Sequence, residues 1–352
     1  MRSVVAIPLA VILMAAACTA TDSSSGPIAT PRPTSSFVPT PAPTPTAQPT
    51  VPTRPPTPDP NVAQQRTAID DLVGLGFPLN IAKSGGELMG PQSTLFAMSR
   101  SVEEGANVLE LDVRLSGDGH LVVHTDDTVE ATTESTEAVL DLDLEELQLL
   151  DNGYWFSGCW PCRDQPDSEY IYRGVRTGEV APPIGFVADD FAIPTFAQAV
   201  QAFPMMPFSI EIKGEGFGGL AVARMLAEEI DSLEIADSVL VVTANDSLLR
   251  AFELLAPEVE TSPGNEELAG WLLRGEPLEG RHRILQVPPP GGAGALLGQS
   301  FWQSIEEAGL EAWVWIADPD TQENLAFYQQ LIADGASGII NGRPNEMAAA
   351  SS

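Results

Sequence analysis

Apolar residues recur with two periods along the chain from residue 79 onward. Short runs rich in Val, Ile, Leu and Trp alternate with longer segments whose apolar positions repeat every three or four residues, which predicts strands alternating with helices. The predicted strands span residues 79–83, 108–114, 208–213, 239–243, 259–261, 284–287, 312–316 and 338–341. The predicted helices span residues 94–104, 195–203, 220–233, 247–255, 266–273, 301–307 and 321–333. Eight strands that alternate with helices predict an α/β fold of the TIM (β/α)8 barrel type.

Two segments interrupt this alternation. Residues 121–124 follow the second strand too closely for a parallel crossover, and Asp118-Gly119 is a strong turn signal, so we expect a β-hairpin extension. Residues 152–193 contain many Gly and Pro residues and predict a small insertion. We expect this insertion on the same face of the barrel, where it would shape a substrate site.

The N-terminal 62 residues have a composition unlike that of the rest. Arg2, an apolar run at 4–14 and the small residues before Cys18 predict a lipoprotein-type signal peptide over 1–18, with a lipid anchor at Cys18. Ordinary signal cleavage, with Cys18 lost or incidental, is the alternative. Residues 19–62 are rich in Pro, Thr and Ser and predict a disordered linker before a domain at 63–352. We therefore expect an exported protein on the outer face of a bacterial cytoplasmic membrane or in the cell envelope, or else a secreted one.

Charge and cysteine content limit the classes of partner. The formal net charge is −32, which excludes nucleic acid as a partner because binding its phosphate backbone requires clustered Lys and Arg. Cys159 and Cys162 are the remaining cysteines, and in an exported chain we favour a disulfide between them. A redox role and a structural zinc site are the alternatives. A redox role requires the cysteine pair to lie at the start of a helix, and a zinc site requires two further ligands nearby.

The chain contains only two lysines, and each ends a predicted strand. Lys83 ends the first strand, and Lys213 ends the strand that carries Glu211. Because side chains alternate along a strand, Glu110 and Asp112 share one face, as do Glu211 and Lys213. Ligands of parallel α/β folds bind at these strand ends, and three carboxylates suit a hard divalent cation. We therefore predict a metal and phosphate site, with an ion-pair network between strands as the alternative.

Several motifs, in this order and spacing, resemble those of the glycerophosphodiester phosphodiesterase family. The resemblance covers residues 79–345. Residues 107–114 look like the family's Glu-x-Asp strand, and Asp118-Gly119 with Val122-Val123 looks like its hairpin. The other matching segments are residues 91–94, similar to Pro-Glu-Asn-Thr, residues 210–213, similar to Glu-Ile-Lys, and residues 339–344, similar to the closing Thr-Asp-Arg-Pro motif.

The resemblance implies a phosphodiesterase site that this chain only partly retains. A divalent cation, Ca²⁺ or Mg²⁺, would be held by Glu110, Asp112 and Glu211, and Lys213 would offset charge on the phosphoryl group. Two family histidines would act as general acid and base. Here the residues at their positions are Lys83 and Thr125. His124 is a possible substitute, but it lies one residue early and would face the other side of the strand unless a bulge turns it.

These departures leave several functions open. The favoured hypothesis is a metal-dependent phosphodiesterase-like domain with reduced or no turnover, which binds a small phosphodiester or a phospholipid head group. The alternatives are an active enzyme that uses Lys83 or His124, a non-catalytic binding module of the cell surface, and a scaffold without a ligand. We expect His120 and His282 at the surface. Trp313 and Trp315 could both pack in the core, or one could border a lipid or glycerol pocket.

Overall fold

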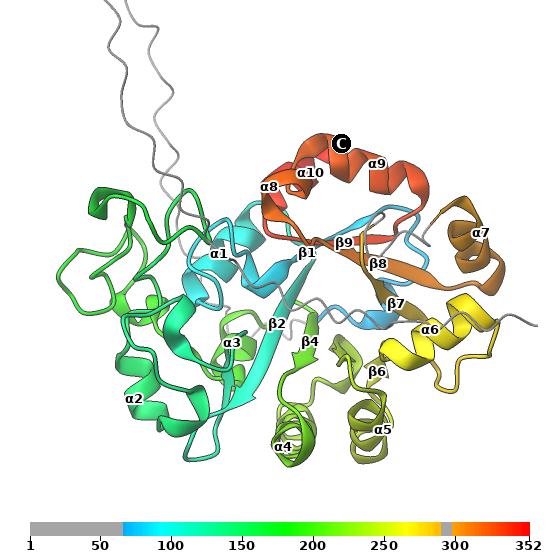
Figure 1. The fold of residues 1–352 in the computed structure, drawn as a ribbon, viewed down its shortest axis with the longest axis horizontal. Helices are drawn as coiled ribbons and strands as arrows, with labels where there is room; N and C mark the ends of the chain where they lie inside the picture. Colours follow the sequence, from blue (N-terminus) through cyan, green and yellow to red (C-terminus); the bar gives the residue numbers. More distant parts are fainter. Residues whose placement is uncertain (1–65, 290–297) are drawn as a thin grey trace, which may run out of the picture. The chain divides into compact units, whose positions relative to one another are not determined.

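The computed structural model of the protein describes residues 66–289 and 298–352. The predicted signal peptide, Cys18 and the linker lie outside the described residues. Eight parallel strands form a nearly closed barrel, with helices around it (Figure 1). They are β1 (Leu79–Ala82), β2 (Val108–Leu115), β4 (Phe208–Ile212), β5 (Val239–Val242), β6 (Glu260–Thr261), β7 (Ile284–Val287), β8 (Glu311–Trp315) and β9 (Gly338–Asn341). The prediction of a barrel with eight parallel strands is confirmed.

Around the barrel, the strands follow one another in the same order as along the chain, except for the hairpin strand. Neighbouring strands follow the path β6-β5-β4-β2-β1-β9-β8-β7, so β6 and β7 are its two ends. The strand β3 (Leu121–Val123) lies off this path and pairs with β2 in antiparallel fashion, with Val113 opposite Val123. The predicted hairpin extension is therefore present.

Helices follow most barrel strands and cover the outside of the sheet. Thr94 starts the first of them, because its side chain accepts a hydrogen bond from the amide of Ala97, and Phe96, Ala97 and Met98 are buried under it. The helices are α1 (Leu95–Glu103), α2 (Leu144–Leu149), α3 (Phe196–Ala202), α4 (Gly216–Ser232), α5 (Asp246–Leu255), α6 (Asn265–Arg274), α7 (Gln299–Ala308), α8 (Pro319–Gln322), α9 (Leu325–Asp334) and α10 (Pro344–Ala350). Among the described residues, no helix is both long and apolar enough to cross a bilayer.

Three elements differ from the sequence prediction. The helix predicted over 321–333 is two helices, α8 and α9, because the side chain of Asn324 accepts a hydrogen bond from the amide of Phe327 and starts a new helix there. The helices α2 and α10 were not predicted. Both are short, with seven residues or fewer, and a helical period is difficult to recognise over so few positions.

Alternation along the strands separates two apolar layers. On β2, Leu109, Leu111 and Val113 are fully buried against the helices. In the opposite direction, one cluster of buried residues contains Val108 together with Ile81, Leu240, Ile284, Trp313 and Ile340 from five other strands. This cluster fills one end of the barrel. Glu110 and Asp112 have the same orientation as Val108 but lie further along β2, so they lie beyond the apolar layer, at the carboxyl ends of the strands.

The segment over 152–193 packs against α1. The ring of Phe96 lies 4.9 Å from that of Tyr172, 4.8 Å from Phe186 and 4.6 Å from Phe191. Arg173 is enclosed by the rings of Tyr154, Trp155 and Tyr170. The segment therefore has an aromatic core of its own, supported by α1.

Candidate active site

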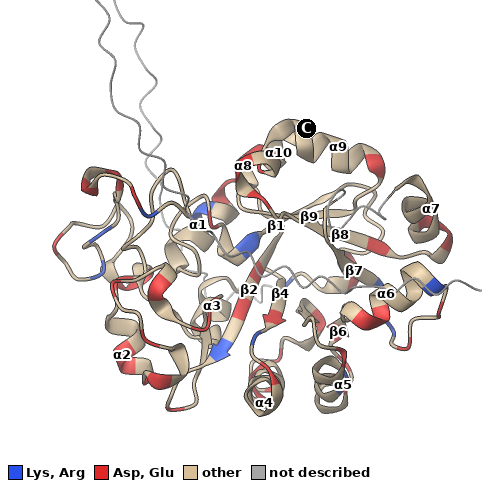
Figure 2. Ribbon diagram, viewed as in Figure 1, with Lys and Arg blue, Asp and Glu red and all other residues tan. Residues whose placement is uncertain are grey.

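Three carboxylates converge where β2 and β4 lie side by side. Asp112 is the direct neighbour of Glu211 in the parallel register, and Glu110 lies two residues earlier on β2, on the same face. One oxygen from each of the three lies within 4.8 Å of the other two. Figure 2 shows these acidic segments next to each other on the two strands. The structure thus brings together the carboxylates that the sequence nominated as metal ligands.

This cluster fits a hard divalent cation. Ca²⁺ binds carboxylate oxygens at about 2.3–2.6 Å, so the oxygens around one ion can be up to about 5 Å apart. The Nζ atom of Lys213 lies 2.8 Å from a Glu211 oxygen and 3.0 Å from an Asp112 oxygen. The ammonium group therefore partly neutralises two of the carboxylates that a cation would bind.

The turn after β1 reaches Glu110 through a backbone amide. Ser84 has a φ of 47°, and its N–H donates to Glu110 Oε2 at 2.7 Å. Gly85 and Gly86 follow with φ of 74° and 104°, and a Cβ on Gly86 would lie 1.8 Å from Ser101 Oγ. Only glycine fits at Gly86, so the sequence Ser-Gly-Gly determines how this turn orients Glu110.

Lys83 stands at the start of this turn and is held as an ammonium ion. Its Nζ donates to Glu87 Oε1 at 2.9 Å, and about a third of its side chain is exposed. Burial alone would lower the pKa of Lys83, but the charges of Glu87, Glu110 and Glu323 and the hydrogen bond to Glu87 raise the pKa above its ordinary value. A charged lysine has no lone pair with which to accept a proton.

Thr125 and His124 lie on opposite sides of the chain after β3. Thr125 lines the same cavity as the carboxylates, and its Oγ1 is 3.5 Å from Ser84 Oγ. His124 is fully buried and does not line the cavity. Its Nε2 is 3.1 Å from the carbonyl oxygen of Thr128, and burial lowers its pKa. No bulge turns His124 toward the carboxylates.

Burial also changes the acidity of the carboxylates themselves. Burial raises the pKa of Glu110 well above its ordinary value, the charge of Asp112 adds to the shift, and the hydrogen bond from Ser84 opposes it. Burial and Asp112 raise the pKa of Glu211, while Lys213 lowers it. For Lys213 burial would lower the pKa, but Asp112 and Glu211 raise it. Burial is thus the first cause of both carboxyl shifts, and a bound cation would favour the charged forms of Glu110 and Glu211.

The cavity that these groups line has a charged half and an apolar half. Its volume is about 470 Å³. The charged half contains four carboxylates and two ammonium groups, from Glu87, Glu110, Asp112, Glu211, Lys83 and Lys213. The apolar half contains Val242, Pro263, Trp315, Ile316, Ala317 and Ile340. When all four carboxyl groups are ionised, they carry two more charges than the two ammonium groups, and one divalent cation would balance this excess.

Comparisons with known proteins agree with this geometry. The sequence model described as "Glycerophosphoryl diester phosphodiesterase family" matches residues 85–336. The chain belongs to this family. A glycerophosphodiester phosphodiesterase from Caldanaerobacter subterraneus subsp. tengcongensis is 46% identical over 78 residues, which is 22% of this chain and 32% of that protein. The chain thus aligns with about a third of that curated relative.

Solved structures of phosphodiesterases share the fold. The Oleispira antarctica phosphodiesterase in complex with the product sn-glycerol-3-phosphate has a TM-score of 0.58 at 20% identity, with 78% of this chain and 96% of that chain covered. The glycerophosphodiester phosphodiesterase from Agrobacterium tumefaciens has a TM-score of 0.56 at 21% identity, with 76% and 98% covered. At these identities the likeness concerns the fold.

One expectation for this phosphodiesterase-family chain is wrong, and another is met only in part. The segment 152–193 lies beside the loop that follows β1, where Asn152 Nδ2 donates to the carbonyl oxygen of Gln92 at 3.1 Å, but none of its residues lines the cavity. His282 is buried rather than at the surface, and its Nδ1 is 2.9 Å from the carbonyl oxygen of Thr261. His120 is exposed, as expected. Trp313 packs in the barrel core, whereas Trp315 borders the cavity.

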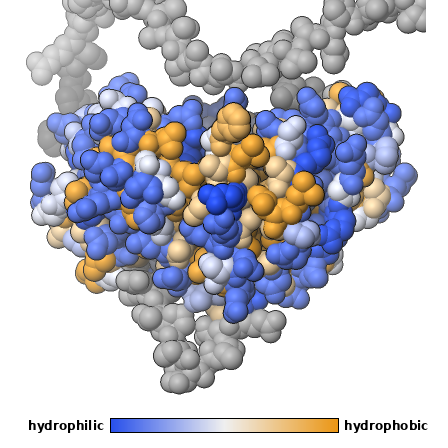
Figure 3. Space-filling model, turned by 90° about the horizontal axis from the view of Figure 1, so that it is seen from below, coloured by the Kyte–Doolittle hydropathy of each residue, from blue (hydrophilic) through white to orange (hydrophobic). Residues whose placement is uncertain are grey.

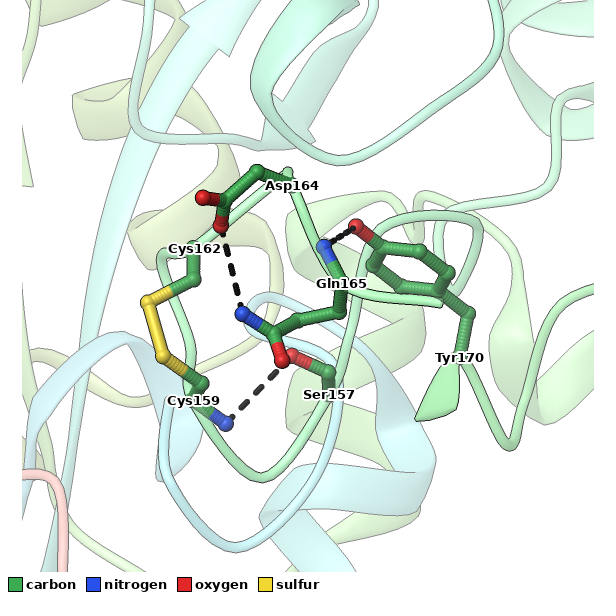
Figure 4. The surroundings of a disulfide bond; sticks show 6 residues. All are labelled: Ser157, Cys159, Cys162, Asp164, Gln165 and Tyr170. Atoms are coloured by element: carbon green, nitrogen blue, oxygen red, sulfur yellow. Dashed lines mark hydrogen bonds between the residues drawn. A yellow bond between two sulfur atoms is a disulfide. The ribbon is translucent and has the colours of Figure 1, made fainter. Parts of the chain in front are cut away.

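The cysteine pair lies in the 152–193 segment. The structure joins Cys159 and Cys162 by a disulfide, and the amide of Cys159 donates to Ser157 Oγ at 3.3 Å (Figure 4). In the same loop the amide of Gln165 donates to the hydroxyl of Tyr170 at 3.0 Å. The disulfide therefore closes a surface loop away from the carboxylate cluster.

Among the groups that contact Lys83 and Glu110, sequence reasoning missed two. Glu87 follows Lys83 by four residues, a spacing that brings charges together on a helix, but here a turn of positive-φ residues does so. The hydrogen bond from the backbone amide of Ser84 to Glu110 cannot be predicted from a pattern of side chains. Both would have been found only from the conformation of the turn after β1.

Proposed function

We propose that this family member is a surface-anchored, metal-dependent protein that binds glycerophosphodiesters and hydrolyses them far more slowly than a member with both histidines. One observation carries the proposal. Lys83 and Thr125 line the cavity beside the three carboxylates, and none of the chain's three histidines, all in the described part, lines it. The binding groups are thus together, and the usual proton-transfer groups are not among them.

The binding role rests on the charged half of the cavity. Glu110, Asp112 and Glu211 would hold the divalent cation, whose chemistry is to act as a Lewis acid and template for a phosphodiester oxygen. Lys213 would offset the negative charge of the phosphate from one side. The Oleispira relative's complex with sn-glycerol-3-phosphate supports a ligand of this size and charge.

The low turnover rests on Lys83 and Thr125. General acid and base groups each contribute about 10²- to 10⁴-fold to a rate. Lys83 is kept protonated by its carboxylate neighbours, so it cannot serve as a base, and a threonine hydroxyl does not titrate near neutral pH. Lys83 is better suited to attract an anion, and Thr125 to donate a hydrogen bond.

Surface anchoring rests on the sequence alone. The apolar run before Cys18 and the Pro/Thr-rich segment after it suit a lipid-anchored protein with a spacer. At about 3 Å per residue, this spacer could hold the domain on the order of 100 Å from a membrane. Mass spectrometry of the mature N-terminus tests the anchor, and an unmodified N-terminus beyond residue 18 would contradict it.

The central test measures binding and turnover together. We expect Ca²⁺ or Mg²⁺ with glycerophosphocholine to raise the melting temperature of the full chain, while choline release stays slow. Glu110→Ala should abolish the shift, whereas Glu228→Ala, an exposed carboxylate on α4, should leave it unchanged. Rapid choline release that Glu110→Ala abolishes would contradict the low turnover. An absence of any response to metal would contradict the whole proposal.

A second test restores the missing groups. We expect the double variant Lys83→His, Thr125→His to release choline on the order of 10²-fold faster than the natural chain, because one general acid or base contributes that much. The matched control is His124→Gln, which changes a histidine outside the cavity. No gain in the double variant, with metal binding intact, would mean that these two positions do not flank the reacting phosphate.

A further inference from the structure

Two polar residues are buried where the segment 152–193 begins. Hydrophilic residues make up much of the face shown in Figure 3, where they contact water. Asp151 and Asn152, in contrast, are each only 1% exposed. The two carboxylate oxygens of Asp151 accept hydrogen bonds from the amides of Gly153 at 3.1 Å and Gly174 at 2.6 Å. Asp151 thus fixes the backbone around Asn152.

The side-chain amide of Asn152 faces the loop after β1, residues 83–94. Its Nδ2 atom donates to the carbonyl oxygen of Gln92 at 3.1 Å and to that of Ser93 at 3.5 Å. Only the nitrogen end of the amide can bind two carbonyl oxygens, and Oδ1 is left buried without a hydrogen-bond partner among the described residues. An unpaired buried acceptor costs stability, which indicates that Asn152 has a role besides holding the fold together.

The loop that Asn152 contacts is strained at two positions. Three residues other than glycine have a positive φ in the described part of the chain, and two of them are Ser84, at 47°, and Ser93, at 57°. This conformation is unfavourable for a residue with a side chain and persists only where neighbouring groups impose it. Asn152 binds the carbonyl groups on both sides of the Ser93 Cα atom, so it holds Ser93 in this conformation.

The same loop reaches the carboxylate cluster through Ser84. The amide of Ser93 donates to the carbonyl oxygen of Ser84 at 2.9 Å, so the two strained positions are tied together. The amide of Ser84 in turn donates to Glu110 Oε2 at 2.7 Å, and Glu110 is one of the three converging carboxylates. Asn152 is therefore connected to the cluster through Ser93 and Ser84, although it does not line the cavity.

We infer that Asn152 is a positioning residue for the metal site. By holding Ser93 and Ser84 in their positive-φ conformations, it keeps the Ser84 amide on Glu110 and so raises the affinity of the cluster for a divalent cation. The inference rests on the proposed function, because it requires that the three carboxylates bind the cation. It gives the segment 152–193 an indirect part in the site, in which the segment supports the loop after β1.

Binding of Ca²⁺ alone to the full chain, measured by calorimetric titration, tests the inference. We expect Asn152→Ala to raise the Kd by about tenfold, because a group that orients a metal ligand from outside contributes about this much. The matched control is Asn80→Ala. It removes a similarly buried amide, which donates to the carbonyl oxygens of Gly105 at 3.1 Å and Pro344 at 2.8 Å. Both variants should lower the melting temperature in EDTA, but Asn80→Ala should leave the Kd unchanged.

A glycine at position 93 separates positioning from stability. Glycine adopts a positive φ without strain, so a chain with Ser93→Gly should depend less on Asn152. We expect the double variant Ser93→Gly, Asn152→Ala to recover most of the lost affinity, whereas Ser93→Gly added to Asn80→Ala should leave the Kd unchanged. If Asn152→Ala does not fold, Asn152→Ser takes its place, since a serine side chain is one bond shorter and should not reach both carbonyl oxygens.

The other outcomes each contradict a defined part. An unchanged Kd in Asn152→Ala, or an equal change in Asn80→Ala, overturns the positioning role and leaves the proposed function standing. A loss of affinity that Ser93→Gly does not recover means that Asn152 does not act through the conformation of Ser93, which also overturns the inference. If the natural chain binds neither Ca²⁺ nor Mg²⁺, the proposed function fails, and the inference fails with it.

Discussion

The two sides of the barrel are held together by different means. Between β2 and β4, five consecutive residue pairs continue the backbone ladder, from Leu109 opposite Phe208 to Val113 opposite Ile212. Between β6 and β7, which end the path of strands, side chains form the bridge. Arg283 contacts Glu260 through Nε at 3.1 Å and Nη2 at 2.6 Å, and the amide of Gln286 donates to Ser262 Oγ at 3.0 Å.

The two sides of the barrel also contribute different residues to the cavity. The three carboxylates lie on the side with continuous backbone pairing, where positions are fixed by hydrogen bonds that no substitution of a side chain removes. The β6–β7 side, which we call the seam, contributes Gln286 and Pro263 to the cavity. We therefore expect changes of charge to affect the stability of the carboxylate side most, and the loss of side-chain contacts to affect the stability of the seam most.

The largest effect is expected on the carboxylate side. Lys213→Met should lower the free energy of unfolding by about 3 kcal/mol in EDTA, because it leaves Asp112 and Glu211 without their ammonium partner. Ca²⁺ should restore much of this loss, since the cation would bind the same two carboxylates. Urea unfolding with EDTA and with Ca²⁺ measures both. Arg224→Met, which breaks an exposed ion pair, should change little, and a loss that Ca²⁺ does not recover would contradict the shared role of these carboxylates.

The seam should respond to a single buried side chain. His282→Leu should cost about 2 kcal/mol of stability, because it removes the hydrogen bond to the Thr261 carbonyl and leaves buried polar groups unpaired. Hydrogen exchange should increase at β6 and β7 and stay unchanged at β2 and β4. His282→Asn, whose amide can reach the same carbonyl, should recover part of the loss. Faster exchange at β2 and β4 alone would mean that the seam is not the weaker side.

The same contrast explains which features the sequence could predict. The eight strands, the hairpin and the shared strand face of Glu110 and Asp112 follow from the local periodicity of the sequence, which can be recognised without knowledge of the fold. His282 was predicted at the surface because two arginines flank it, but side chains alternate before β7, so the histidine faces inward while Arg283 faces outward. The Lys83–Glu87 pair and the seam depend on turn geometry and on long-range contacts, which no local pattern encodes.

The smallest predicted effect on stability concerns Glu229 of α4. This helix packs against the carboxylate side of the barrel, but Glu229 does not belong to the carboxylate cluster. Burial raises the pKa of Glu229 to about 6, with His120 opposing, and its Oε2 is buried without a hydrogen-bond partner among the described residues. A carboxyl group whose pKa is higher in the folded state destabilises the fold once it ionises, so this cost is absent below pH 4.5 and complete above pH 6.

Glu229→Gln should therefore stabilise the protein by about 1 kcal/mol at pH 7, a figure reduced because the group is partly exposed to water. The gain should shrink as the pH falls through 6 and vanish near 4, where the carboxyl group of the natural chain is neutral in both states. Thermal unfolding between pH 4 and 8 measures this dependence. Glu228→Gln, one residue earlier and exposed beside Arg224, should give no gain at any pH. A stabilisation by Glu229→Gln that is constant across this range would show that the amide acts through new contacts rather than through the removed charge.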